Sequence, residues 1–271
     1  MDSQRRSMTE IPTSVIVIAA GFGSRLMPLT EHLPKCMLPV QSVPILHRTL
    51  ETFDQLGIEE KTVIGGYKAE NLAIPTGVNL LINSEYQSNN ILHSLAYARN
   101  EFVYGTDTIV CYSDIIFQKA IAEQLLESSL GDIILVVDRK WQTRYVDREL
   151  HLIAEAEAAN FDAELKLLQV GKTLLTSDAN SNEWGEFLGL VKFTSRGAQA
   201  FWDIFDKINQ QLAPDEPFQA ASEWQKSYLT DLFQELIDRG ISVHCLLIDG
   251  GWEEIDNRED YDYAQVFKFT D

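Results

Sequence analysis

"VIVIAAGFGSRLMPLTEHLPK" (residues 15–35) joins a short apolar run to a loop rich in glycine, proline and cations. The run Val15–Ala20 is β-branched at its start and is followed by Gly21, a pattern that predicts a strand buried on both faces of a parallel sheet. A glycine-rich loop after the first strand lies at the carboxyl edge of an open α/β sheet, where anions bind. The stretch therefore predicts a backbone that closely approaches a phosphate, with Arg25 and Lys35 as its cations.

Strands and helices alternate along the chain at the spacing of right-handed crossovers. We expect strands at 15–20, 61–65, 78–82, 108–112, 132–137 and 242–248, and helices at 44–57, 68–72, 90–101, 196–212 and 222–239. After residue 138 a charged, aromatic-rich stretch leads to two antiparallel or edge strands, at 165–170 and 187–193. This order predicts an α/β fold with a doubly wound, mixed and mostly parallel sheet. We expect a flexible tail at 1–13 and a single domain over 14–271, with a substrate-side insertion and edge strands at about 139–193.

The bulk composition excludes several classes of protein. The net charge is −19, with 41 acidic and 22 basic side chains. This argues against a nucleic-acid-binding protein, which needs cations against phosphates, and against binding to an anionic membrane surface. The sequence contains no run of about 18 apolar residues, the length that a membrane-spanning helix needs. Three widely spaced cysteines and an N-terminus without the pattern of a secretory signal predict a reducing, cytoplasmic location.

The glycine loop (residues 19–35) fits one of three phosphate-binding patterns. A dinucleotide fingerprint needs a third glycine where Leu26 stands, and a Walker loop needs G-x-x-x-x-G-K-[ST], which the sequence lacks. The pattern AAGxGxRLxPLT…PKxxLPV (residues 19–40) instead resembles the signature of the sugar-phosphate nucleotidylyltransferases almost position by position. The resemblance implies a Rossmann-like nucleotidyltransferase fold that binds a nucleoside triphosphate.

Four further segments narrow the resemblance to one branch of these enzymes. These segments are NSEYQSNNILHSL (83–95), YSDIIF (112–117), GEFLGLVKF (185–193) and WEEID (252–256). They resemble the bacterial phosphocholine cytidylyltransferases and similar enzymes that act on aminoethylphosphonate. The resemblance implies a Mg²⁺-dependent enzyme that joins CTP, or another nucleoside triphosphate, to phosphocholine or a similar small alcohol phosphate or phosphonate. The products would be a CDP-alcohol and pyrophosphate. Because a phosphate monoester is already anionic, this in-line displacement needs no general base.

The resemblance also implies roles for particular residues. Arg25 would stabilise the departing pyrophosphate and Lys35 the incoming phosphate. The nucleotide-binding residues would be Ala19, Ala20, Gly21, Gly23, Ser24, Asn83, Asn89, Asn90 and Ser94. Asp114 and Asp256 follow separate strands and would hold Mg²⁺. The residue types leave a structural alternative open, because an aspartate or asparagine at such a position can also cap a helix or order a loop.

A quaternary ammonium acceptor predicts an aromatic cage with an acidic neighbour. The candidates for the substrate-binding cage are Tyr112, Trp141, Tyr145, Trp184, Glu186 and Trp252, with Glu186 and Trp184 as the best pair. Any one of these aromatic residues can instead belong to the core. Arg144 or Arg148 would hold a substrate phosphate or form a surface salt bridge.

Two rival functions stay open at this point. A hexose-1-phosphate nucleotidylyltransferase that uses dTTP, UTP or GTP would need a more polar acceptor pocket than the predicted cage. A non-catalytic regulatory subunit of the same fold would be expected to lack Arg25, Lys35 or Asp114, and the sequence has all three. The oligomeric state is left open.

Overall fold

The computed structural model describes residues 11–146, 148–150, 152–174, 180 and 183–269. Strand β1 begins at Thr13, so the last residue of the predicted tail belongs to the central sheet. The carbonyl of Pro12 accepts a hydrogen bond of 2.8 Å from the backbone N–H of Asp107 and ties the start of β1 to its neighbour. Residues 1–10 of the predicted tail lie outside the described residues.

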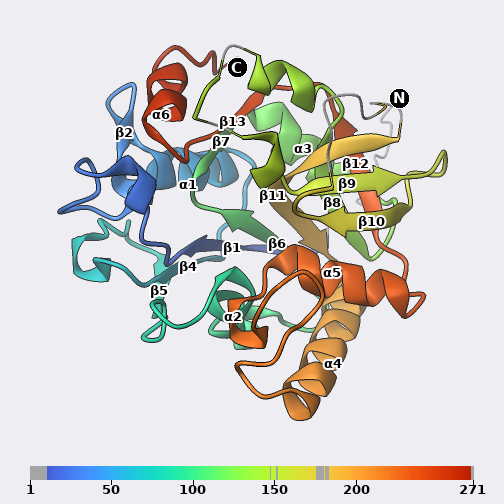
Figure 1. Cartoon of the computed structure of the whole chain (residues 1–271). Coiled ribbons are helices and arrows are strands. Elements are labelled where there is room, and N and C mark those ends of the chain that lie inside the picture. The colour runs from blue at the N-terminus through green and yellow to red at the C-terminus, as the bar shows by residue number, and fades with distance from the viewer. Residues whose placement is uncertain (1–10, 147, 151, 175–179, 181–182, 270–271) are drawn as a thin grey trace, which may run out of the picture.

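The first half of the chain forms four parallel strands in the order β6-β1-β4-β5 (Figure 1). These strands are β1 (Thr13–Ala19), β4 (Lys61–Gly65), β5 (Val78–Ile82) and β6 (Asp107–Tyr112). The side chains of β1 are buried from Val15 onward on both faces of the sheet, as its continuous apolar run predicts. The order places the carboxyl ends of β1 and β6 side by side.

The second half of the chain turns the sheet into a mixed one. It adds β8 (Ile133–Asp138), β9 (Ala158–Phe161), β10 (Leu167–Gly171), β11 (Trp184–Phe193) and β12 (His244–Ile248). The long strand β11 runs antiparallel to β6, β8 and β9, and β12 pairs with β8 in parallel. The mixed α/β sheet predicted from the sequence is therefore confirmed, including its antiparallel strands in the insertion.

A small two-stranded sheet, which the sequence did not predict, carries part of the site. Its strands are β7 (Ile115–Phe117) and β13 (Trp252–Glu254), which pair antiparallel with Ile115 opposite Glu254. The backbone N–H of Ile255 also donates to the carbonyl of Asp114 at 2.9 Å. This pairing brings the end of the chain against the loop that follows β6.

Helices cover both faces of the central sheet, as a doubly wound fold requires (Figure 1). One face carries α1 (Ile45–Gln55) and α3 (Lys119–Glu127), and the other carries α2 (Ile91–Ala96), α4 (Ser195–Gln211) and α5 (Leu229–Asp238). Two of the predicted helices are too long. Helix α2 ends at Ala96, and α5 starts at Leu229 because the Asp231 carboxylate caps the backbone N–H of Tyr228. None of the helices among the described residues is long and apolar enough to cross a membrane.

The last helix, α6 (Arg258–Ala264), packs against the glycine loop rather than against the central sheet. Leu26 and Leu38 of that region are buried in one cluster with Ile255 and Ala264. Apolar contacts with the C-terminal part of the chain therefore hold one side of the glycine loop, and polar groups of the loop line the cavity described below.

Candidate active site

A cavity of about 330 Å³ opens at the carboxyl edge of the sheet, between the glycine loop and the 139–193 insertion. The predicted site residues that line it are Ala19, Ala20, Gly21, Gly23, Arg25, Lys35, Asn89, Asn90, Ser94, Tyr112, Asp114, Glu186, Trp252 and Asp256. Ser24, Asn83, Trp141, Tyr145 and Trp184 are not among the lining residues. The structure thus brings most of the predicted site together, while the roles of these residues stay predictions.

The glycine loop is shaped by side chains that contact its backbone. Gly23 has φ of +63°, a left-handed conformation that favours glycine, and a Cβ added there would lie 2.9 Å from Cβ of Lys35. The hydroxyl of Thr30 donates to the Gly23 carbonyl at 2.9 Å, and the Tyr67 hydroxyl donates to the Thr30 carbonyl at 3.1 Å. The loop can therefore bring Lys35 close to its own backbone only because residue 23 lacks a side chain.

Two cations from the glycine loop meet carboxylates in the cavity. Nζ of Lys35 lies 2.8 Å from Oδ2 of Asp114 and also donates to Oδ1 of Asp256. Nη2 of Arg25 lies 2.7 Å from Oδ2 of Asp256, and its other terminal nitrogen pairs with Glu155 of the insertion. Burial opposes the charged form of Lys35, yet Asp114 and Asp256 outweigh it and raise its pKa above the ordinary value. Lys35 is therefore a fixed positive charge at the centre of the site.

Three carboxylates converge beside this lysine. One oxygen from each of Asp114, Glu254 and Asp256 lies within 4.8 Å of the other two. Oδ1 of Asp114 is buried and has no hydrogen-bond partner among the described residues. Burial, together with Asp256 and Asp114, raises the pKa of Glu254 well above its ordinary value. An unpartnered carboxylate oxygen within an all-oxygen donor set fits a hard divalent cation such as Mg²⁺.

Glu254 is the member of this cluster that sequence reasoning missed. Residues 254 and 256 are two apart at the end of an extended segment, and a period of two places such side chains on one face. The signal was present in WEEID, but it required β13 to be recognised as a strand.

At the nucleotide end of the cavity, several of the predicted base-binding side chains form hydrogen bonds with one another. Asn83 is fully buried and uses its whole amide, donating to Asn89 and Ser94 at 2.9 Å each and accepting from the Glu85 backbone and from Asn89. Asn90 caps α2 by accepting from the Ile91 N–H at 2.9 Å. Asn83 therefore positions Asn89 and Ser94, which line the cavity, and the capping alternative holds for Asn90.

The predicted aromatic cage is not assembled around the cavity. Trp141 is fully buried in a small cluster with Ala156 and Ala158, against which Tyr145 and Trp184 also pack. These three aromatic side chains form a small apolar core between residues 141–145 and the start of β9, separate from the main core. The prediction that they line the acceptor site is not supported by their positions.

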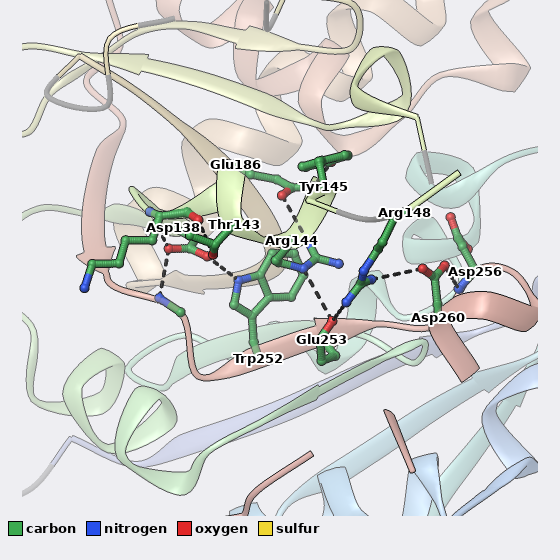
Figure 2. Close-up of polar contacts among 12 residues, drawn as sticks. Asp138, Thr143, Arg144, Tyr145, Arg148, Glu186, Trp252, Glu253, Asp256 and Asp260 are labelled. Atoms are coloured by element: carbon green, nitrogen blue, oxygen red, sulfur yellow. Dashed lines mark hydrogen bonds and ion pairs between the residues drawn. The ribbon is translucent and has the colours of Figure 1, made fainter. Parts of the chain in front are cut away.

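Glu186 and Trp252 do line the cavity, but both side chains already contact other side chains of this protein (Figure 2). Nη1 of Arg144 lies 3.0 Å from Oε2 of Glu186, and its guanidinium carbon lies 3.8 Å from the ring centroid of Trp252. The Tyr145 hydroxyl donates to Oε1 of Glu186 at 2.7 Å, and Nε1 of Trp252 donates to Asp138 at 2.9 Å. The cation that contacts Glu186 and Trp252 is therefore Arg144 of this chain, in the place predicted for the quaternary ammonium group.

Arg144 and Arg148 are buried, not surface residues as one alternative predicted. Each side chain is only 4% exposed. Arg148 pairs with Glu253 at 2.7 Å and with Asp260 at 3.0 Å, which joins the insertion to β13 and α6 (Figure 2). Both arginines are therefore engaged in holding the insertion on the carboxylate-bearing strand.

Three further residues that sequence reasoning missed line the opposite wall: Glu157, Lys172 and Tyr228. Glu157 immediately precedes β9 and Lys172 immediately follows β10, and the antiparallel register that pairs Ala158 with Gly171 sets them opposite each other. Nζ of Lys172 lies 4.2 Å from the ring centroid of Tyr228. Burial raises the pKa of Glu157 to about 7, although Lys172 opposes the shift.

Solved structures and curated sequences resemble this chain, some over most of its length and others over a part of it. CTP:phosphocholine cytidylyltransferase from Streptococcus pneumoniae has a TM-score of 0.70 and 20% identity, over 94% of this chain and 98% of that one. CTP:phosphoglutamine cytidylyltransferase of Campylobacter jejuni is 27% identical over 257 residues, 91% of this chain and 97% of the relative. Choline-phosphate cytidylyltransferase of Streptococcus pneumoniae is 35% identical over 89 residues, 32% of this chain and 39% of the relative.

The structural likeness confirms the fold, and the sequence likeness places cytidylyltransferases among the relatives of this chain. The family described as "MobA-like NTP transferase domain" matches residues 15–180, which is more than half of the chain and includes the glycine loop and Asp114. The chain therefore belongs to the MobA-like NTP transferase family and is a nucleotidyltransferase of the cytidylyltransferase type.

Proposed function

We propose that this protein transfers the cytidylyl group of CTP to a small phosphate or phosphonate that carries an amine or a quaternary ammonium group, and releases pyrophosphate. Phosphocholine, which the sequence resemblance favours, belongs to this class of acceptor, and the relatives named above act on phosphocholine and phosphoglutamine. The observation that carries the proposal is the convergence of Arg25 and Lys35 with three carboxylates around one cavity. A phosphoryl-transfer site needs this combination of cations and metal ligands.

The reaction requires positioning and charge stabilisation rather than a base. An oxygen of the acceptor phosphate attacks the α-phosphorus of CTP, while the bond from this phosphorus to the bridging oxygen breaks and its electron pair leaves with pyrophosphate. Arg25, at the mouth of the cavity, is assigned to the departing pyrophosphate, and Lys35 and Lys172 to the phosphate groups between the two walls. Since all three are cations at neutral pH, the negative charge is stabilised throughout.

Asp114, Glu254 and Asp256 would hold the divalent cation. When it is bound there, Mg²⁺ supplies charge neutralisation on the phosphate oxygens. Lys35 contacts two of these carboxylates, so it also limits their mutual repulsion and keeps them together. We therefore assign Lys35 both to the phosphate and to the order of the metal ligands.

Pyrophosphate release tests the proposal most directly. CTP, UTP, dTTP, GTP and ATP would each be combined with Mg²⁺ and with phosphocholine, 2-aminoethylphosphonate or glucose-1-phosphate. We expect release with CTP and the amine-bearing acceptors. Release with dTTP or UTP and glucose-1-phosphate would assign the protein to the hexose-1-phosphate class instead. A panel without release, from a protein that also fails to bind CTP in calorimetry, would support the regulatory alternative.

A further inference from the structure

Two of the aromatic rings at the acceptor end of the cavity are covered by cations of the chain. One face of Trp252 lies under the guanidinium of Arg144, at 3.8 Å from the ring centroid. One face of Tyr228 lies under the ammonium of Lys172, at 4.2 Å. A second cation brought to either face would meet the charge already there. These two rings are therefore poor partners for a quaternary ammonium group.

The third ring at this end, Tyr112, is covered by backbone. A Cβ added at Gly189 would lie 2.2 Å from Cδ2 of Tyr112, so the glycine lets β11 lie directly against the ring. Phe187 meets the same ring edge-on, with centroids 5.9 Å apart. A trimethylammonium group cannot donate a hydrogen bond and is bound by ring faces. The rings of Trp252 and Tyr228 therefore each have a cation of the chain over one face, and the ring of Tyr112 packs against Gly189 and Phe187.

Glu157, in contrast, has unused hydrogen-bonding capacity. It is 9% exposed, lines the cavity, and its Oε2 accepts one hydrogen bond of 3.2 Å from the Tyr112 hydroxyl. Its Oε1 has no hydrogen-bond partner among the described residues. The neighbouring Glu186 has both oxygens engaged, by Arg144 and by Tyr145. Glu157 is therefore a carboxylate on this wall that is placed to accept hydrogen bonds from a ligand.

We propose that Glu157 binds a protonated primary amine of the acceptor and thereby selects against quaternary ammonium compounds. The acceptor class is then a phosphate or phosphonate with a primary amine a few atoms from phosphorus. A primary ammonium donates up to three hydrogen bonds and matches a carboxylate, whereas a trimethylammonium group donates none. Lys172, opposite Glu157 across β9 and β10, supplies the complementary charge for the phosphate end. This inference rests on the proposed cytidylyl transfer.

A methylation series tests this selectivity. Pyrophosphate release would be measured with CTP, Mg²⁺ and phosphoethanolamine, its N-methyl and N,N-dimethyl derivatives, and phosphocholine. We expect kcat/KM to fall stepwise along the series, at least tenfold from the first member to the last, because each methyl removes a donor. Equal or rising values toward phosphocholine would overturn the inference while leaving cytidylyl transfer intact.

The variant Glu157→Gln keeps the shape of the side chain and removes its charge. We expect KM for phosphoethanolamine to rise at least tenfold, with kcat and KM for CTP within twofold of the parent, and the discrimination against phosphocholine to shrink. Glu164→Gln, an exposed position in the turn between β9 and β10, is the matched control and should leave every constant unchanged. An unaltered KM in Glu157→Gln would contradict the assignment.

A binding measurement separates failure of the inference from failure of the proposed function. If no acceptor supports pyrophosphate release, cytidylyl transfer fails, and thermal stabilisation by each acceptor alone is then measured. Stabilisation by phosphoethanolamine but not phosphocholine, lost in Glu157→Gln, would support the amine site in a protein with another activity. Equal stabilisation by both, or by neither, would overturn it.

Discussion

The two walls of the cavity differ in how the chain places their charged groups. On the nucleotide wall, Arg25 and Lys35 lie in the glycine loop after β1, and Asp114 lies two residues after the end of β6. On the acceptor wall, formed by the insertion and β13, most charges are paired inside the protein, as in the contact of Arg144 with Glu186. The order of the strands thus brings the charged residues of the nucleotide wall together. The positions of the charges on the acceptor wall depend instead on which side chains pair with each other. A charge on the acceptor wall cannot be assigned to a ligand until its internal partners are known.

Removing Lys35 should have the largest effect on the nucleotide wall. In Lys35→Met we expect kcat to fall by about 10²- to 10³-fold, in the range found when a positioned donor to a transition-state oxyanion is lost. The variant also leaves Asp114 and Asp256 without their shared cation, so Mg²⁺ should raise its melting temperature more than that of the parent.

Lys207→Met, on the exposed side of α4, is the control for removal of a lysine and should behave as the parent in pyrophosphate release. Circular dichroism would check that both variants keep the fold. A Lys35→Met protein with nearly normal turnover would remove Lys35 from the phosphate site and weaken the distinction between the two walls.

Glu254 links the walls, because β13 carries it from the acceptor side into the carboxylate cluster. In Glu254→Gln we expect the Mg²⁺ concentration for half-maximal activity to rise at least tenfold, since one anionic oxygen ligand is lost. Glu123→Gln on the exposed side of α3 serves as the control in the same magnesium titration. An unchanged titration curve would limit the metal ligands to the two aspartates.

Breaking the buried pair of Arg144 and Glu186 tests the acceptor wall by stability rather than by activity. The two side chains are 4% and 2% exposed, so Arg144→Met leaves a buried carboxylate uncompensated and should cost about 3 to 5 kcal/mol in urea unfolding. The double variant with Glu186→Gln should recover part of that loss.

The exposed pair of Arg99 and Asp206 is the matched comparison, with side chains 43% and 39% exposed. Arg99→Met should cost less than about 1 kcal/mol, because water screens such pairs. Similar losses for the buried and the exposed arginine would mean that the network of the acceptor wall does not hold the insertion in place.

Sequence reasoning succeeded where local pattern determines position. The run Val15–Ala20 and the spacing of glycines in the loop after it predicted β1 and the glycine loop, and the strands at 61–65 and 78–82 have the predicted bounds. Each of these signals lies within a few residues of the feature it predicts.

It failed where side chains distant in sequence compete for the same partner. KWQTRYVDR contains cations and aromatic residues, but nothing in this stretch shows that Arg144 faces Trp252, more than a hundred residues away. Likewise, Glu157 and Lys172 become a pair only through the β9–β10 register. The residue types of an acceptor site were visible, but their division between core and cavity required the fold.

The pH dependence of stability also separates the two walls. Burial raises the pKa of Glu157 from an ordinary value of 4.5 to about 7, with Asp231 and Asp114 adding to the shift and Lys172 and the Tyr112 hydroxyl opposing it. The native state therefore retains this proton where the unfolded chain has lost it. The stabilisation is complete below about pH 4.5 and is lost as the pH rises through 7. Relative to Glu157→Gln, the parent should lose on the order of 3 kcal/mol of unfolding free energy across this range. Urea unfolding at several pH values measures the difference in unfolding free energy between the parent and Glu157→Gln. The contributions of the other titrating groups are the same in both proteins and cancel in this difference. A constant difference would mean that the acceptor wall already solvates Glu157 as a carboxylate before any amine arrives.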